Sequence, residues 1–334
     1  MALKWGIVGA SKISHDFCTA LRSQHTAKPH EIHAIASRSK ANADEFAQRH
    51  DILHAYGSYE ELAQNVNIEV VYVAVLNHMH FEVVKMMLEA GKPVVCEKPF
   101  AMNHNQAKEL ISLAKKENLF LMEGLWTRFF PVYRHFSAAL TRNAFGDIRE
   151  VYVKHGFCGS DSARIVRKDM GGGIVLDIGC YAIQLVVLVF QEAPKSIKAE
   201  GKINSNGIDL FFQADLEFSK GRRAYITCSG LEALENQSTI ISTKGPICMP
   251  TYWCPSHYIA NGQLHEWRLP ITADNWNYTN SIGLIYEADH VFECIRAGQT
   301  ISEIVPPTDT LLIAQIQDEI RKQIGVQYDC DESL

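Results

Sequence analysis

The first 125 residues alternate short apolar runs with amphipathic segments, and this alternation constrains the fold more than any other feature of the chain. The runs KWGIVGA, from Lys4, and EVVYVAV, from Glu69, are rich in the apolar and β-branched residues of buried strands. Between such runs, apolar residues recur at helical spacing, as in Ile13, Phe17 and Leu21. Repeats of this kind predict an α/β fold, a doubly wound parallel sheet with crossover helices.

Residues 126–334 have a different pattern. Their strand-like segments often alternate polar and apolar residues and are separated by Gly, Asn and Ser, which predicts a mostly antiparallel sheet. Helical patterns near 173–190, 281–297 and 308–325 are expected to cover one face of it. We therefore predict two domains, 1–125 and 126–334, which suits a chain of 334 residues because single cores rarely grow so large.

Composition limits the partners that such a chain can have. It is 47% hydrophobic and 21% charged with a formal net charge of −6, and it has no basic run to attract nucleic acid. Its start enters strand-like sequence directly, and the longest apolar run, LVVLVF at 185–190, is too short to cross a membrane. Nine cysteines without a CxxC pair fit reduced thiols. We expect a cytoplasmic protein with no nucleic-acid or membrane partner.

The turn after the first predicted strand, GASKIS, is the first candidate for ligand binding. Gly9 permits a tight turn, and the helix that follows offers free backbone N–H groups to a pyrophosphate. Ser11 and Ser14 stand where a dinucleotide motif usually has glycines, so an ordinary strand–helix turn is the alternative. On the first interpretation, Gly9, Ser11 and Ile13 contact the cofactor.

The end of the second predicted strand, ASRSK, indicates which dinucleotide would bind. An acid at this place favours NAD, whereas an arginine can accept the 2′-phosphate of NADP. The chain has Ser37 and Arg38 here and no acid before Asp44. We predict NADP, with a solvated basic loop as the alternative.

The segment LNHMH follows the most β-branched run of the chain. Asn77 and His80 could line the nicotinamide ribose, because ligands bind at the carboxyl ends of parallel strands. His78 and His80 form an H-x-H pair, but no further ligands appear at a recognisable zinc spacing. We expect no metal site.

Two further segments carry groups suited to acid–base chemistry. In VVCEKPFA, Glu97 and Lys98 leave the end of a strand, and both are expected to bind the cofactor. Pro99, through a cis peptide bond, would hold Lys98 toward a cleft. In GGGIVLDIGCY, Asp177 and Tyr181 are four residues apart in a predicted helix. A nearby lysine would favour proton transfer at the tyrosine. The alternative is a packed Tyr181 and a structural Asp177.

The segments GIVGASKIS, CEKP and GGGIVLDIGCY, in this order, resemble the glucose–fructose oxidoreductase/inositol dehydrogenase/MocA (Gfo/Idh/MocA) family along nearly the whole chain. MALKWGIVGA, AYGSYEELA, LFLMEGLWTRFFP and WCP resemble its branch of animal dimeric dihydrodiol dehydrogenases, also described as NADP-dependent D-xylose dehydrogenases. The resemblance implies an N-terminal Rossmann domain, a C-terminal open-faced antiparallel sheet with helices on one face, and a homodimer formed through that sheet.

The resemblance also implies residue roles. Tyr181 would be the proton donor and acceptor, Lys98 would contact substrate and cofactor ribose, and Asp177 would support them. Arg38 would hold the 2′-phosphate. The other positions implied in coenzyme or substrate binding are Tyr72 and His80 for the coenzyme, and Trp126, Arg128, Phe129 and Arg149 for the substrate pocket. Two features depart from the branch: Ser11, and the loop 158–170 before the glycines.

These features together predict an NADP(H)-dependent oxidoreductase that moves hydride between the nicotinamide and a hydroxyl or carbonyl carbon. The expected substrate is an aldose such as D-xylose, oxidised to a lactone, or a trans-dihydrodiol, oxidised toward a catechol. The open alternatives are an anhydrofructose-type reductase of a dicarbonyl sugar and a non-enzymatic NADP-sensing regulatory protein.

Overall fold

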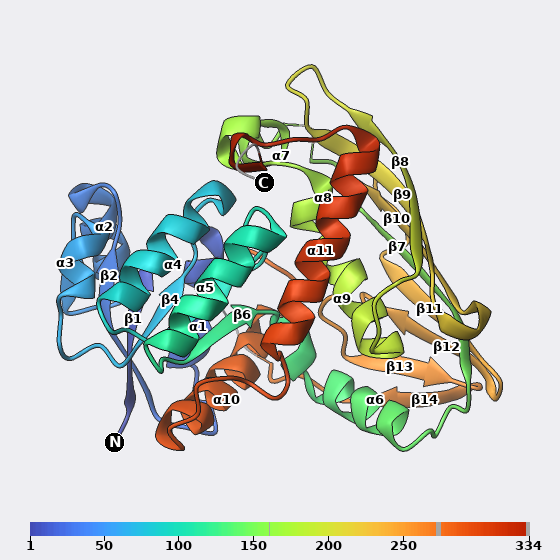
Figure 1. The fold of residues 1–334 in the computed structure, drawn as a ribbon. Coiled ribbons are helices and arrows are strands. Elements are labelled where there is room, and N and C mark those ends of the chain that lie inside the picture. The colour runs from blue at the N-terminus through green and yellow to red at the C-terminus, as the bar shows by residue number, and fades with distance from the viewer. Residues whose placement is uncertain (160, 272–274, 332–334) are drawn as a thin grey trace. The chain divides into compact units, whose positions relative to one another are not determined.

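The computed structural model describes residues 1–159, 161–271 and 275–331, which form two compact units, coloured along the chain in Figure 1. The first unit comprises Met1–Phe100, Gln106–Phe129 and Leu269–Pro307, and the second comprises Ala101–Asn105, Phe130–Arg268 and Thr308–Leu334. The chain therefore enters each unit more than once.

The first unit contains a six-stranded sheet in the order β3-β2-β1-β4-β5-β6, in which every pairing is parallel. Its strands are β1 Leu3–Val8, β2 His30–Ala36, β3 His54–Tyr56, β4 Val70–Val73, β5 Val94–Glu97 and β6 Leu121–Gly124. This confirms the predicted doubly wound sheet. The strand order reverses between β1 and β4, and in such sheets ligands bind outside the carboxyl ends of the strands at the reversal.

Local signals in the sequence explain where the helices of this sheet begin and end. These helices are α1 Lys12–Arg22, α2 Lys40–Arg49, α3 Tyr59–Ala63, α4 His80–Glu89, α5 His104–Lys116 and α10 Leu284–Arg296, with 3₁₀ turns η1 Asn77–Met79, η2 Trp126–Phe129 and η5 Ser281–Gly283. Ser58 caps α3 by accepting the backbone N–H of Glu61 at 3.2 Å. Gly91, with φ +76°, follows α4 in the left-handed conformation expected of it.

One buried carboxylate accounts for the late segment 269–307 in the first unit. Asp16 of α1 accepts hydrogen bonds from the backbone N–H groups of Asn277 and Tyr278 and from the hydroxyl of Ser281. A buried charge is stable only when it is hydrogen-bonded, so these contacts tie the segment to α1. Residues 269–307 therefore belong to the first compact unit, whereas a single boundary after residue 125 would place them in the second domain.

The second unit contains an eight-stranded sheet in the order β14-β13-β12-β11-β7-β10-β9-β8. Its strands are β7 Ile148–Gly156, β8 Ser196–Ile203, β9 Asp209–Glu217, β10 Arg223–Ser229, β11 Gln237–Ser242, β12 Gly245–Pro250, β13 His257–Ala260 and β14 Gln263–Glu266. Only the β7–β10 pairing is parallel among the described pairings, which confirms a mostly antiparallel sheet.

Helices lie on one face of this sheet (Figure 1). They are α6 Pro131–Thr141, α7 Ala163–Val166, α8 Ile174–Asp177, α9 Gly179–Phe190 and α11 Pro307–Ile324, with 3₁₀ turns η3 Lys168–Met170, η4 Ser219–Gly221 and η6 Asp329–Asp331. Gln323 of α11 bonds the backbone of the edge strand β8 at Ile197 and Ala199. One helix was expected over 173–190, but Ile178 separates α8 from α9.

No individual helix among the described residues has both the length and the apolar composition for a membrane span, although 168–177 and 179–190, bent by 41°, meet those two criteria as a pair.

Candidate active site

The turn between β1 and α1 has the tight geometry that a pyrophosphate needs. Gly9 has φ +101°, and a Cβ built on it would lie 2.5 Å from the carbonyl oxygen of Ala74, so only glycine fits. The Ser14 hydroxyl donates to the Gly9 carbonyl at 2.6 Å, and the Ser11 hydroxyl caps α1 by accepting the N–H of Ser14. Serine hydroxyls thus close a turn that other dinucleotide motifs close with glycines. These residues fit a dinucleotide at the N-terminus of α1.

The end of β2 presents an exposed arginine. Arg38 is exposed and lies near Tyr59: burial raises the pKa of Tyr59, and the charge of Arg38 acts in the opposite direction. Ser37 is buried and its backbone N–H donates to the Tyr56 carbonyl at 3.2 Å. Lys40 forms an ion pair with Asp44 within α2. Arg38 is therefore better placed than Lys40 to meet an external phosphate.

A buried network fixes the backbone at the end of β5. Tyr72, on the neighbouring strand β4, donates its hydroxyl hydrogen to Oε1 of Glu97, and Oε2 of Glu97 accepts the backbone N–H of Lys98 at 3.2 Å. The Lys98–Pro99 peptide bond is cis, which confirms the hypothesis made from the sequence. Tyr72 is fully buried and stacked on Phe17, with ring centroids 3.9 Å apart. It acts on this region through Glu97.

His80 is a brace for the same segment. Its ring is 1% exposed, with Nδ1 2.7 Å from the carbonyl oxygen of Pro99 and Nε2 3.1 Å from that of Val75. Burial lowers the pKa of His80 to about 4, against the effect of the two carbonyl groups, so the ring is neutral at pH 7. Both nitrogens point at the protein backbone, so His80 is poorly suited to ligate a metal.

The late helix α10 adds a carboxyl group that the sequence did not single out. Glu287 is 1% exposed, and neither of its carboxylate oxygens has a hydrogen-bond partner among the described residues. Burial, and then the charge of Glu97, raise its pKa well above the usual value. Glu97 is itself buried, which raises its pKa too. Two carboxyl groups close together in a dry environment favour a protonated Glu287.

The residues predicted from LFLMEGLWTRFFP and LNHMH all lie in the first unit. Trp126, Arg128 and Phe129 are almost fully buried in η2, and Arg128 donates to the carbonyl of Ile304 at 3.3 Å. Asn77 begins η1 and is half-buried. A direct role for the three η2 residues in substrate binding stays a prediction.

In the second unit, the three glycines before α8 allow three other segments to approach closely. The backbone N–H groups of Gly172 and Gly173 donate to the carbonyl oxygens of Arg167 and Ile165, at 3.0 and 2.9 Å. A Cβ on Gly173, which has φ +118°, would lie 2.6 Å from Oδ1 of Asp209 and 2.8 Å from the hydroxyl of Tyr328. Because any side chain here would clash, the glycines are needed for packing around α8.

Asp209 supports α8 from β9. Its Oδ2 accepts the backbone N–H of Val175 at 2.6 Å, and its Oδ1 has no hydrogen-bond partner among the described residues. Burial raises the pKa of Asp209 to about 6, while backbone N–H groups, including that of Val175, act in the opposite direction. Asp209 thus stabilises the first turn of the short helix that ends at Asp177.

Asp177 and Tyr181 lie on either side of the break at Ile178. Oδ1 of Asp177 accepts a hydrogen bond from the guanidinium of Arg164 at 2.8 Å, and the Asp177 side chain is 6% exposed. Its carbonyl accepts the thiol hydrogen of Cys180 at the start of α9. The break replaces the continuous helical face expected from the spacing of four.

Tyr181 is 7% exposed and lies in an aromatic cluster of the second unit. Its ring centroid is 6.3 Å from that of His155 on β7 and 6.0 Å from that of Trp253, and these two rings also stack, 5.9 Å apart. Nδ1 of His155 is 3.1 Å from the hydroxyl of Tyr252, and burial raises the pKa of that hydroxyl well above its usual value.

The sequence analysis did not identify His155 and Trp253. The alternation of Val151, Val153 and His155 on the buried side of β7 could have indicated a buried histidine.

Arg149 is not brought into this cluster. It lies on β7 six residues before His155, and a strand of six residues spans about 20 Å. Its side chain is exposed. A role for Arg149 beside Tyr181 would require a substrate much longer than a single sugar.

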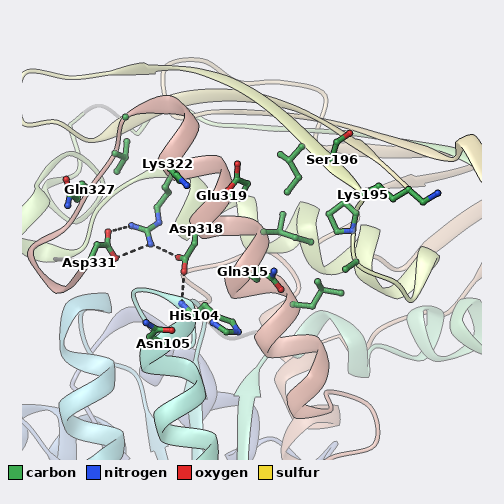
Figure 2. A pocket seen from close by; sticks show the side chains of 18 residues that line it. His104, Asn105, Lys195, Ser196, Gln315, Asp318, Glu319, Lys322, Gln327 and Asp331 are labelled. Carbon is green, nitrogen blue, oxygen red and sulfur yellow. Dashed lines mark hydrogen bonds and ion pairs between the residues drawn. The ribbon is translucent and has the colours of Figure 1, made fainter. Parts of the chain in front are cut away.

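A cavity of about 1030 Å³ lies along α11 in the second unit and contains none of the predicted site residues (Figure 2). Arg321 bonds Asp318 at 2.6 Å and Asp331 at 2.7 Å, and Asp318 accepts the backbone N–H of His104 at 2.8 Å (Figure 2). These contacts brace the C-terminal segment, whose Tyr328 hydroxyl donates to the carbonyl of Gly172. The network therefore supports the glycine segment rather than a recognisable ligand site.

Comparison with known proteins decides the family. Residues 3–125 match the model described as "Oxidoreductase family, NAD-binding Rossmann fold", and residues 133–248 match the "GFO/IDH/MocA C-terminal domain". The chain belongs to the Gfo/Idh/MocA oxidoreductase family. Trans-1,2-dihydrobenzene-1,2-diol dehydrogenase of Xenopus tropicalis is 43% identical over 98% of this chain and 100% of its own, and that of Homo sapiens is 37% identical over 99% and 100%. The resemblance inferred from the sequence motifs is confirmed.

Solved structures show the same family fold. A 3-ketoreductase from Actinomadura kijaniata in complex with NADP and TDP-benzene is 23% identical, with a TM-score of 0.81 over 98% of this chain and 99% of its own. Levoglucosan dehydrogenase in complex with NADH and levoglucosan is 19% identical, with a TM-score of 0.83 over 97% of each chain. This family member therefore has the fold of an oxidoreductase with a nicotinamide cofactor.

Proposed function

We propose that the protein is an NADP(H)-dependent dehydrogenase that oxidises a hydroxyl group of a trans-dihydrodiol or of an aldose such as D-xylose. The observation that carries the proposal is the presence of Lys98 after β5 and Tyr181 on α9 in a chain 37–43% identical, over its full length, to dihydrodiol dehydrogenases. A protein that only sensed the cofactor would need neither group.

The proposed chemistry divides between a proton and a hydride. When bound, the nicotinamide supplies the hydride acceptor or donor that side chains lack. Tyr181 takes the proton of the substrate hydroxyl in the oxidative direction and returns it to the carbonyl oxygen in reduction. Lys98 stabilises negative charge on that oxygen, and Glu97 holds the Lys98 backbone in one orientation.

The aromatic cluster around Tyr181 supports a ring-shaped substrate. Trp253 is half-exposed, and its ring lies 6.0 Å from that of Tyr181 at an interplanar angle of 50°. Aromatic faces bind apolar ring surfaces, which both a pyranose and a cyclohexadiene diol present. The cluster does not rank the two substrate classes.

Substrate profiling tests the proposal. The protein is mixed with NADP⁺ and either D-xylose or trans-1,2-dihydrobenzene-1,2-diol, and NADPH formation is followed by absorbance. Reduction of a dicarbonyl sugar with NADPH, without oxidation of either substrate, would favour the anhydrofructose-type reductase. Binding of NADPH with no turnover in either direction, together with a stable protein partner, would favour the regulatory protein.

Arg38→Ala is expected to weaken NADPH binding about 10–100-fold, because a hydrogen bond to a charged group contributes about 1.5–3 kcal/mol. NADH binding should change little, since NADH lacks the 2′-phosphate. Fluorescence titration with both cofactors measures this selectivity. Lys40→Ala is the matched control because Lys40 is already paired with Asp44. Equal losses for NADPH and NADH would contradict the assignment.

A homodimer through the exposed face of the eight-stranded sheet is part of the proposal. Tyr152 and Tyr225 stack on that face, 4.8 Å apart, and Tyr152 is 40% exposed. Ile259 and Leu264 are paired across β13 and β14 and are exposed on the same sheet. An apolar surface of this kind is typical of an interface between copies of one chain.

Tyr152→Asp is expected to convert this dimer to a monomer, because a charge would be buried without a partner at the interface. Sedimentation velocity measures the change. Leu53→Asp, at an exposed apolar residue of the first unit, is the control and should remain dimeric. A monomeric parent protein would refute the dimer.

A further inference from the structure

The short helix α7, in the loop 158–170, is held against the glycine segment 171–173 by its backbone. Ile165 and Arg167 supply the carbonyl oxygens that accept the N–H groups of Gly173 and Gly172. A Cβ on Gly172 would lie 2.4 Å from the Ile165 oxygen, so this approach depends on glycine. Ser160, earlier in the loop, lies outside the described residues. The glycines thus fix the backbone on the C-terminal side of Arg164.

With its backbone held in this way, Arg164 contacts Asp177 through its side chain. Arg164 Nη1 lies 2.8 Å from Asp177 Oδ1, and the two side chains are 44% and 6% exposed. A charge-assisted hydrogen bond of this length orients a carboxylate as well as neutralising it. Because the carboxylate is buried and the guanidinium is partly in water, most of the desolvation cost falls on Asp177.

Other titratable groups also pack around this segment. Cys180 of α9 donates its thiol hydrogen to the Asp177 carbonyl, and Tyr181 follows Cys180 in the same helix. Asp209 of β9 and Tyr328 of the C-terminal segment meet the start of α8 at Gly173. Arg321 lies over the ring of Tyr328, and its charge acts on Asp209. Arg164 pairs directly with Asp177 and favours its ionised form.

We propose that Arg164 is a positioning residue for the reaction: it holds Asp177 ionised and in one rotamer, one residue before the break that leads to Tyr181. The role of Arg164 rests on the proposed dehydrogenase function, since it acts through Asp177 and Tyr181. The close backbone packing of α7 on the glycine segment thus places the Arg164 guanidinium beside the buried Asp177 carboxylate.

The test compares three variants of the full-length protein. Arg164→Met removes the charge and keeps most of the side-chain volume, and it should lower kcat/KM about 10–100-fold. The acid limb of its pH profile should move to higher pH, because a carboxylate that loses its counter-charge protonates more readily. Arg164→Lys should retain the parent's acid limb. Arg167→Met is the matched control, since the Arg167 side chain pairs with exposed Asp169 in the same loop; it should match the parent.

Two measurements separate positioning from a loss of folding. Guanidinium ion added to Arg164→Met should restore part of the activity, which a misfolded protein cannot do. In the Asp177→Asn background, Arg164→Met should cause little further loss, because the two changes remove one interaction. Absence of rescue, an unshifted pH profile or additive losses would each overturn the proposal.

A readout without turnover distinguishes this proposal from the dehydrogenase proposal. In protein labelled with ¹³C at aspartate carboxyl groups, the Asp177 signal is assigned by its loss in Asp177→Asn. Its titration midpoint should lie at higher pH in Arg164→Met than in Arg167→Met. An unchanged midpoint refutes the role of Arg164 even in an active enzyme. A shifted midpoint in a protein that oxidises no substrate would refute the proposed function and leave the ion pair supported.

Discussion

Tyr181→Phe is expected to lower kcat about a thousandfold while leaving NADPH binding nearly unchanged. General acid–base groups contribute about 10²–10⁴ to rates, and phenylalanine keeps the ring but cannot exchange a proton. The ring contacts with His155 and Trp253 should survive, so substrate KM should change only slightly. Steady-state kinetics with NADP⁺ and the best substrate, beside NADPH titration, measures the two quantities separately.

A second buried tyrosine provides the control for this change. Tyr133 also lies in the second unit, where its hydroxyl accepts a hydrogen bond from Gln184 at 3.0 Å. Tyr133→Phe should lower stability by about 1–3 kcal/mol, because it leaves a buried amide without that partner, but the folded enzyme should turn over normally. A Tyr181→Phe enzyme with a tenth or more of the parent kcat would show that another group moves the proton.

The fold of the first unit was predictable because its signals are local. Buried parallel strands appear as β-branched runs, and the helices between them start and stop at capping residues such as Ser58 and Gly91. The second sheet was harder to read. Strand β12 was missed because it carries Pro246 and Pro250, and proline normally argues against an interior strand. Strand β13 was missed because four residues give too short an alternation.

Candidate site residues were likewise predictable only where a local segment of the sequence indicated them. Lys98 and Tyr181 could be predicted as site residues because each stands in a segment that resembles a family motif, and both predictions stay untested. Arg164 and Glu287 were not predicted because their contacts, with Asp177 and near Glu97 respectively, form only in the folded chain. Arg164 reads as a solvated residue of a polar loop, and only the packing of α7 on the glycines brings it to Asp177. Glu287 reads as part of an exposed helical face, yet α10 buries it with both oxygens unpartnered among the described residues.

The contacts of His80 could not be predicted from the sequence. A histidine at the end of a strand suggests a ligand contact, and its spacing from His78 suggests a metal. The structure instead encloses the ring between two backbone carbonyls. Any effect of His80 on the cofactor would pass through the segment that holds Pro99, so its predicted role in cofactor binding stays untested.

Lys98→Met is the second change with a large expected effect. It should lower kcat about 10²–10³-fold, the usual loss when one group that stabilises negative charge on oxygen is removed. NADP(H) binding should weaken by a smaller factor, since the lysine is expected to contact the ribose as well. Single-turnover absorbance and cofactor titration measure the two effects. Lys85→Met, at a half-buried lysine paired with Glu109 in the same unit, is the control and should keep full activity.

The size of the Lys98 effect follows from how firmly its backbone is held. Glu97 accepts the Lys98 N–H, Tyr72 donates to the same carboxylate, and His80 holds the carbonyl of Pro99. Lys98→Met leaves these backbone contacts in place, so the variant should fold with an unchanged melting temperature while losing turnover. A fixed backbone sets where the Lys98 side chain begins, and such preorganisation makes a charge effective in catalysis. If Lys98→Met instead lost stability and turnover in parallel, Lys98 would be a structural residue and the proton and charge roles would have to be reassigned.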